Sequence, residues 1–251
     1  MFDAFIPVAA SSLLQYTDLR ESKDKWSGSI QFNGAAASGN TNSVVLGGRF
    51  NAARTYGAIT HAFDAGGNYT EVDRVVNGSE TRQVTQNRWH TQYRIEIQTG
   101  DASFFYGRAR YEEDQFSGFD RQAFAGGGFG HAFYDTDTRK LDVLVGPGIQ
   151  YIVRTQTNNA PANAEDDEIT FAVFLGQTFT KVLRENVTFE QSFDGTSSET
   201  NNTVVARVAL KTDLTDKISS RISYGVTHNT DPPEGRENTD TLLSASIGFE
   251  F

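Results

Sequence analysis

Apolar and polar residues alternate along most of this chain, and the last stretch, TLLSASIGFEF (241–251), shows the alternation most plainly. Leu243, Ala245, Ile247, Phe249 and Phe251 share one side, and small or polar residues share the other. A period of two is typical of a β-strand between an apolar and a polar medium. The stretch is therefore either the last strand of a soluble sandwich with its apolar side inward, or the closing strand of a transmembrane β-barrel with that side in lipid.

Similar alternating segments follow one another from Lys25 to the end, without a helical period of useful length between them. The pattern predicts an all-β chain of about twelve strands in which consecutive strands pair antiparallel. We expect these strands near 25–37, 43–55, 58–70, 83–98, 102–113, 119–134, 139–154, 168–180, 186–194, 202–212, 217–229 and 240–251.

The connections alternate in length, and this favours the membrane barrel. Tight links are expected at 56–57, 99–101, 135–138, 181–185 and 213–216. Longer links are expected at 71–82, 113–119, 155–167, 195–201 and 230–239, with 38–42 as a short exception. Short turns on one rim and long loops on the other are typical of a bacterial outer-membrane up-and-down barrel, with short turns in the periplasm and long loops outside.

Rows of charged side chains share a face within single strands. In the fourth segment Arg88, His90, Arg94 and Glu96 lie opposite a face with Trp89. Such a row does not form a protein core, so it lines either a soluble surface or a wet lumen. The candidate lumen residues are Arg88, His90, Arg94, Glu96, Arg108, Arg110, Glu112, Arg154, Arg207, Lys211 and Arg221. Pairing the fourth and fifth segments across Gly100 predicts that Arg88 lies opposite Glu112 and His90 opposite Arg110.

Aromatic residues near the ends of the apolar faces suit the two interfaces of a membrane. The candidates for lipid-interface aromatics are Trp89, Tyr93, Phe105, Tyr111, Phe171 and Phe179. Phe249 and the terminal Phe251 are the candidate signal for the barrel-assembly machinery. Residues 1–24 are expected to be a periplasmic segment, either a short helix or a disordered tether, followed by one barrel over 25–251.

Composition narrows the function classes. The chain has no cysteine, which excludes thiol catalysis, disulfides and cysteine metal sites. Its formal net charge of −10 argues against general nucleic-acid binding. Only 37% of residues are hydrophobic, and no run approaches the ~18–20 apolar residues of a spanning helix, whereas alternation allows a barrel at this hydropathy.

The search for catalytic chemistry yields no site. His61, His90, His131 and His228 fall on different segments without a metal-binding spacing. Ser220 shares a face with His228 but lies about 26 Å away along the strand, too far for a hydrolase pair. The sequence therefore predicts no catalytic residue, no metal and no cofactor.

Several motifs in order resemble a known family. They are WSGSIQFNGAAASGNTNS (26–43), TQNRW (85–89), YEEDQF (111–116), FDRQAFAGGGFGHAFY (119–134), GPGIQY (146–151) and the terminal GFEF. The chain is similar over residues 25–251 to the YdiY-like, salt-induced outer-membrane family, classed as domain of unknown function 481. The resemblance implies an outer-membrane barrel of a Gram-negative bacterium and carries over neither a catalytic residue nor a substrate.

Two hypotheses of function remain after this, with a lipid hydrolase as a less favoured third. The first is a structural or stress-response barrel with a narrow, charged and closed interior. The second is a small anion-preferring diffusion channel, because the inward faces carry more Arg and Lys than Asp and Glu although the chain is acidic. The expected partners are outer-membrane lipids and lipopolysaccharide, the assembly machinery and, for a channel, small anionic solutes.

Overall fold

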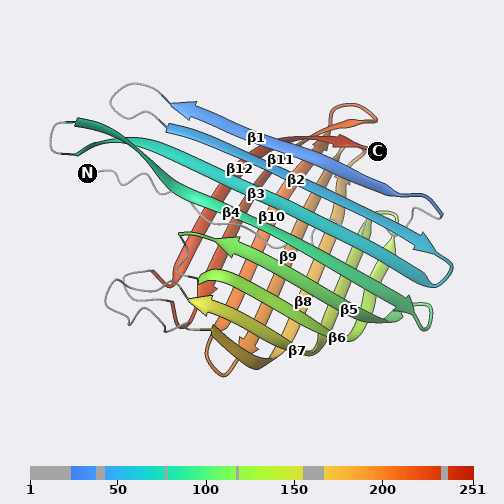
Figure 1. The fold of residues 1–251 in the computed structure, drawn as a ribbon. Helices are drawn as coiled ribbons and strands as arrows, with labels where there is room; N and C mark the ends of the chain where they lie inside the picture. Colours follow the sequence, from blue (N-terminus) through green and yellow to red (C-terminus); the bar gives the residue numbers. More distant parts are fainter. Residues whose placement is uncertain (1–23, 38–42, 77–78, 117–118, 155–166, 233–236) are drawn as a thin grey trace.

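A computed structural model describes residues 24–37, 43–76, 79–116, 119–154, 167–232 and 237–251 (Figure 1). The segment expected over 1–24 therefore lies outside the described residues, apart from Asp24. Over the described ranges, no helix of sufficient length and hydropathy to span a bilayer is found.

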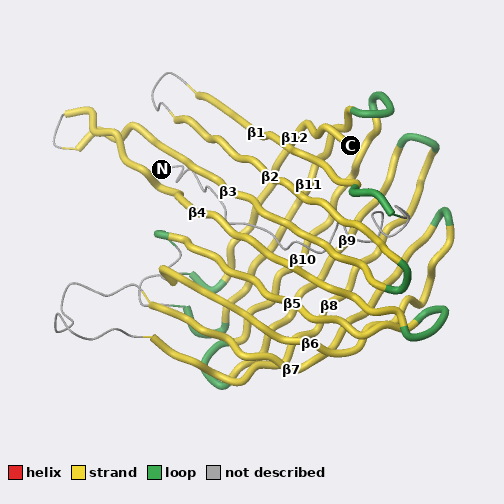
Figure 2. Tube along the Cα trace, turned by 45° about the vertical axis from the view of Figure 1, so that its right-hand side comes forward, coloured by secondary structure: helices red, strands yellow, loops and turns green. Residues whose placement is uncertain are grey.

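The described chain forms a closed antiparallel barrel of twelve strands (Figures 1 and 2). The strands are β1 (Ser27–Ala37), β2 (Ser43–Tyr56), β3 (Ile59–Val76), β4 (Ser79–Gln98), β5 (Ser103–Asp114), β6 (Phe119–Thr136), β7 (Arg139–Arg154), β8 (Asp167–Arg184), β9 (Val187–Ser198), β10 (Asn202–Asp213), β11 (Ile218–Asn229) and β12 (Thr239–Glu250). Each strand pairs with its neighbour in sequence, and β1 pairs with β12. The predicted fold class, an all-β up-and-down barrel, is confirmed.

The apolar side chains face outward. On β8, Phe171 is 65% exposed and Val173 is 45% exposed, while Ala172 between them is fully buried. On the inward face of β4, Arg88, His90, Arg94 and Glu96 are all buried. A soluble sandwich would have the opposite arrangement, so the inside-out pattern fits a barrel surrounded by lipid.

The links between strands define two rims. The short-turn rim contains the links 57–58, 99–102, 137–138, 185–186 and 214–217, and the C-terminus lies at this end (Figures 1 and 2). The opposite end, called here the long-loop rim, contains 38–42, 77–78, 115–118, 155–166, 199–201 and 230–238. Because the strand number is even, the start of β1 and the end of β12 lie at the same rim.

The expected long links at 71–82 and 195–201 are wrong, because most of these residues belong to strands. The β3–β4 hairpin continues to Val76 and Ser79 and extends past its neighbours in Figure 1. Arg82 holds the two strands together through ion pairs to Glu71 at 3.0 Å and Asp73 at 3.1 Å. The dipeptide Asn77-Gly78 is a strong sequence signal for a two-residue hairpin and could have predicted the extension.

The seam between β1 and β12 is short. It holds four residue pairs, from Ser29↔Glu250 to Phe32↔Ile247, whereas β1 and β2 share eleven. Beyond Glu250, Gly28 and Phe251 exchange two backbone hydrogen bonds of 3.0 Å. The ring of Phe251 also stacks on Phe50 of β2, with 6.2 Å between ring centroids. The terminal residue is therefore part of the closure of the barrel.

An apolar cluster, called here the apolar plug, fills part of the interior toward the short-turn rim. It consists of Ala53, Ala62, Phe104, Tyr106, Leu144 and Phe174, with Phe124 packed against it. Glycine makes room for these rings, since a Cβ at Gly130 would lie 2.3 Å from the Phe104 ring and one at Gly148 would lie 2.5 Å from the Phe124 ring. The glycine-rich stretch of β6 thus serves close packing.

Deleting Phe251 should lower the yield of heat-modifiable barrel in the membrane several-fold, because the deletion removes backbone hydrogen bonds from the shortest seam. Phe251→Ala keeps those bonds and loses only the ring, so we expect an intermediate yield. Phe249→Leu, at an outward position, is the matched control and should assemble normally. Band-shift gels of membrane fractions measure the yield, and equal yields for all three variants would contradict the role of Phe251 in closure.

Candidate functional site

The interior of the barrel is the candidate site because it concentrates buried polar side chains. Ser192, Gln92 and Glu190 all face the inside of the barrel. Ser192 is 0% exposed, and Gln92 and Glu190 are each 1% exposed. Among the residues that the structure describes, no group of three or more His, Asp or Glu side chains could hold a metal ion. The polar side chains described there form ion pairs and hydrogen bonds.

Asp64 of β3 is the centre of one part of this interior. Its carboxylate lies 2.7 Å from Nε of Arg49 on β2 and 2.8 Å from Nε2 of His90 on β4. The pairings Arg49↔Gly66 and Gly66↔His90 place these side chains at nearly one level on three neighbouring strands. A buried carboxylate flanked in this way is stabilised by charge-assisted hydrogen bonds.

A second group of ion pairs in the interior links β4 and β5. Arg88 lies 2.9 Å from Glu112 and 3.7 Å from Asp114, and Arg110 also pairs with Glu112. Arg94 pairs with Glu96 on the same face at 2.8 Å.

The predicted register of these two strands is wrong by two residues. Arg88 lies opposite Asp114 and His90 opposite Glu112, because the hairpin is centred on Asp101 rather than on Gly100. The backbone N–H of Thr99 donates to the Ser103 carbonyl at 2.9 Å and closes this turn. An even shift leaves every side chain on its predicted face, and the expected Arg88–Glu112 pair forms diagonally.

Other contacts cross the interior between strands that are not neighbours. Arg108 of β5 lies 3.9 Å from Asp194 of β9, and it also donates to Gln92 on the neighbouring β4 at 2.9 Å. Its guanidinium is also 4.3 Å from the ring centroid of Phe174, which joins the charges to the apolar plug. Arg221 of β11 lies 3.0 Å from Glu190 of β9. We call the buried set Arg49, Asp64, Arg88, His90, Arg94, Glu96, Arg108, Arg110, Glu112, Asp114, Glu190, Asp194 and Arg221 the inner charge network.

Most predicted lumen residues face the interior, but two lie at the rims. Arg154 is at the long-loop rim, 3.3 Å from Asp231, and Lys211 is at the short-turn rim, 3.2 Å from Glu250. The inward acids that sequence reasoning omitted are Asp64, Asp114 and Asp194. The alternation of β3, β5 and β9 already placed them inward, so parity along the strands was the signal that could have found them.

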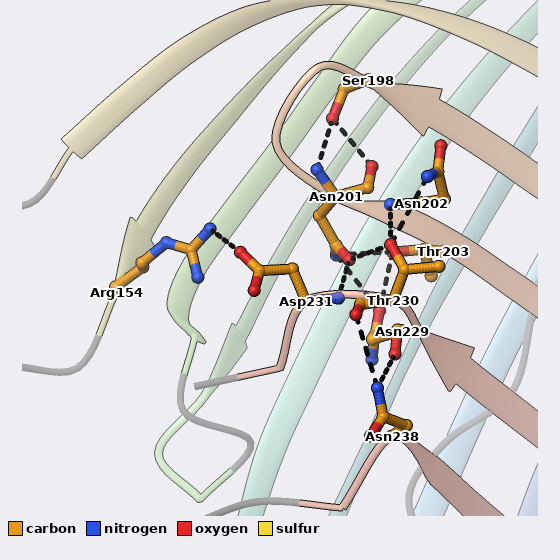
Figure 3. A network of polar contacts seen from close by, with 9 residues as sticks. All are labelled: Arg154, Ser198, Asn201, Asn202, Thr203, Asn229, Thr230, Asp231 and Asn238. Atoms are coloured by element: carbon orange, nitrogen blue, oxygen red, sulfur yellow. Dashed lines mark hydrogen bonds and ion pairs between the residues drawn. The ribbon is translucent and has the colours of Figure 1, made fainter. Parts of the chain in front are cut away.

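The long-loop rim carries an amide and hydroxyl cluster (Figure 3). Buried Asn201, in the β9–β10 link, accepts from the backbone N–H of Asp231 at 3.1 Å and donates to Asn229 at 3.3 Å. Thr203 donates to the same Asn229 oxygen at 2.7 Å, and Asn238 donates to the Asn229 carbonyl at 2.9 Å. These contacts fasten the β9–β10 turn to the described ends of the β11–β12 connection.

The predicted interface aromatics lie on the outer surface. Trp89, Tyr93, Phe105 and Phe171 are exposed, and Tyr111 and Phe179 are partly exposed on the same outward face. Trp89 donates to Glu113 at 3.1 Å. Trp89 thus combines an apolar ring with a hydrogen-bonding N–H group, and this combination suits a membrane interface, where apolar and polar surroundings meet.

One serine–histidine pair was missed from the sequence. Ser103 Oγ lies 3.0 Å from His131 Nδ1 across β5 and β6. His228 instead contacts Thr239 at 2.8 Å. Neither ring contacts a carboxylate of a described residue, so neither has the third group that orients the base in a hydrolase triad.

The fold and its inverted surface define a class, the outer-membrane type of β-barrel. Two solved structures of this class are similar to the chain at 12% identity each. The translocator domain of the autotransporter NalP from Neisseria meningitidis matches with a TM-score of 0.52 over 90% of this chain and 87% of that one. The NanC porin matches with a TM-score of 0.51 over 89% and 98%. At this identity the likeness shows the fold alone.

The family follows from the sequence. The profile of the family described as "Protein of unknown function, DUF481" matches residues 30–251, and the chain belongs to this family. The chain is also 24% identical over 235 residues to the uncharacterized protein YdiY of Escherichia coli K12, covering 93% of this chain and 86% of that protein. The family resemblance read from the motifs is confirmed.

Asp64→Asn should destabilise the barrel strongly. The change keeps the shape of the side chain but leaves buried Arg49 without its counter-charge, which typically costs about 3–5 kcal/mol. Asp73→Asn is the control, since its partner Arg82 is 69% exposed and such a pair contributes about 0–1 kcal/mol. The urea midpoint for loss of the heat-modifiable band measures both, and equal midpoints would show that Asp64 does not stabilise the interior.

Proposed function

We propose that this chain is a barrel of the Gram-negative outer membrane with a structural or stress-response role, and that its interior is closed to solutes. The observation that carries the proposal is the packing of the interior. Inward side chains such as Ser192 and Gln92 are buried, and Arg108 reaches from β5 toward Asp194 on β9. A diffusion pore instead keeps its wall side chains in contact with water.

The charge balance supports a closed interior. Asp64, Asp114 and Asp194 compensate much of the cationic excess that motivated the anion-channel hypothesis. Removing one member of a buried pair leaves an uncompensated charge, so opening the bore would cost several ion pairs at once. The apolar plug adds a dry layer toward the short-turn rim.

A small anion channel is the second candidate, and Arg207 favours it. This residue faces the interior from β10, and within the described ranges it forms no ion pair. A partly buried cation without a counter-charge is a place where an anion would be stabilised. The NanC structure, which shares the fold, is named a porin. A lipid hydrolase is less favoured, because no acid among the described residues contacts His131 of the Ser103–His131 pair.

A planar-bilayer recording in asymmetric KCl separates the two candidates. The closed barrel predicts no steady current from the refolded wild type. Phe104→Ala combined with Phe174→Ala removes the two most deeply buried rings of the apolar plug and should raise the frequency of brief openings.

A steady, anion-selective current that Arg207→Gln shifts toward cations would establish the channel and contradict closure. Arg82→Gln, on the exposed hairpin, is the matched charge control and should leave the recording unchanged. A steady cation-selective current in the wild type would contradict both candidates.

A further inference from the structure

A pocket of about 540 Å³ opens on the outer surface of the barrel at the short-turn rim. It is lined by Trp26, Arg54, Tyr56, His61 and Tyr93. The pairing Arg54↔His61 sets two of these residues side by side on β2 and β3, and the adjacent pairing Ser27↔Ala53 places Trp26, the residue before β1, next to them. Their neighbours Ala53 and Ala62 belong to the apolar plug, so the pocket residues point away from the interior.

Arg54 is the cation of this pocket. Its Nε is buried and has no hydrogen-bond partner in the part of the chain that the structure describes, and none of the five lining residues is acidic. Asp24 lies nearby, where its backbone N–H donates to the Thr55 carbonyl, but it forms no ion pair with Arg54. An unsatisfied guanidinium nitrogen on the lipid-facing side of a barrel is costly, and an anionic ligand would satisfy it.

The other lining residues suit the headgroup level of a membrane. Trp26, Tyr56 and Tyr93 are exposed amphipathic rings of the kind that gathers at membrane interfaces. The Tyr93 hydroxyl lies 2.6 Å from Nδ1 of His61. When Tyr93 donates to Nδ1, the neutral imidazole carries its proton on Nε2, which is then free to donate to an anion. Above the pocket, Phe50 and Phe63 are in contact on the outer wall, with ring centroids 6.0 Å apart.

We propose that this pocket binds the phosphate of a membrane phospholipid, with Arg54 as the principal contact. Guanidinium is planar and matches the oxygens of a phosphate in a two-point contact. The acyl chains would lie along the apolar wall above, over Phe50 and Phe63. The site rests on the proposed membrane location but not on whether the interior is open.

Native mass spectrometry of the full chain in a neutral detergent tests the site. We expect phosphatidylglycerol to stay bound and diacylglycerol with the same chains to be lost, because only the former carries the phosphate. Arg54→Gln should reduce the bound fraction about tenfold or more, since it removes a charge-assisted contact. Arg82→Gln, which removes an exposed arginine far from the pocket, should bind like the wild type.

Equal retention of both lipids, or equal binding by Arg54→Gln, would overturn the proposal. Complete displacement of phosphatidylglycerol by excess inorganic phosphate would also overturn it, because the site would then recognise a free anion. Arg54→Lys keeps the charge and loses the planar fork, so it carries the test if Arg54→Gln gives no heat-modifiable barrel. Failure of the wild type to insert into vesicles would contradict the membrane location separately.

Discussion

Buried carboxylates hold the arginines of this barrel in place, and most of the interior depends on that pairing. Charges cannot be left unpaired inside a low-dielectric wall without a large cost. Asp64 meets this requirement for Arg49 and also hydrogen-bonds His90, and Glu112 meets it for Arg88 and Arg110. Because each acid serves partners on different strands, the pairs also fix the strands relative to one another.

Closure of the sheet is the second requirement besides the pairing of buried charges. At the short-turn rim the same residues serve both. In lipid every backbone N–H and C=O must find a partner, which a closed barrel provides. The β1–β12 seam provides this over four residue pairs and the Gly28–Phe251 exchange. Glu250, next to the terminal residue, accepts from Ser219 and pairs with Lys211, so the seam is tied to β10 and β11 by side chains as well.

The alternation of side chains along each strand places one set in the interior and the other on the outer surface. On β3, Ala62 and Asp64 pack inside while His61 and Phe63 lie outside. The neighbouring Arg54 of β2 therefore lies on the outer surface although it is one residue from the buried Ala53. A single strand can thus place side chains both in the interior and in the outer pocket around Arg54 without any change in its backbone.

The fold class and the face on which each side chain lies could be predicted, because a period of two assigns side chains to faces without knowledge of the register. Arg88 and Trp89 needed only their parity to be assigned to the correct faces. The partners of Arg88 were harder to predict, because the hairpin is centred on Asp101 rather than on Gly100, and moving the centre by one residue moves every pair by two positions.

Contacts between distant strands could not be predicted from any local sequence pattern. The approach of Arg108 to Asp194 depends on how the barrel closes in three dimensions. The same holds for the pocket around Arg54, which collects residues from four strand regions.

Because the chain has no cysteine, introduced thiols can measure directly whether water-borne solutes reach the middle of the barrel. Ser192→Cys places a thiol at a fully buried inward position, and Asp101→Cys places one in an exposed turn. If the interior is closed, a small charged thiol reagent modifies the folded Asp101→Cys protein rapidly and the folded Ser192→Cys protein orders of magnitude more slowly. Similar rates at the two positions would show an open, solvated bore and contradict closure.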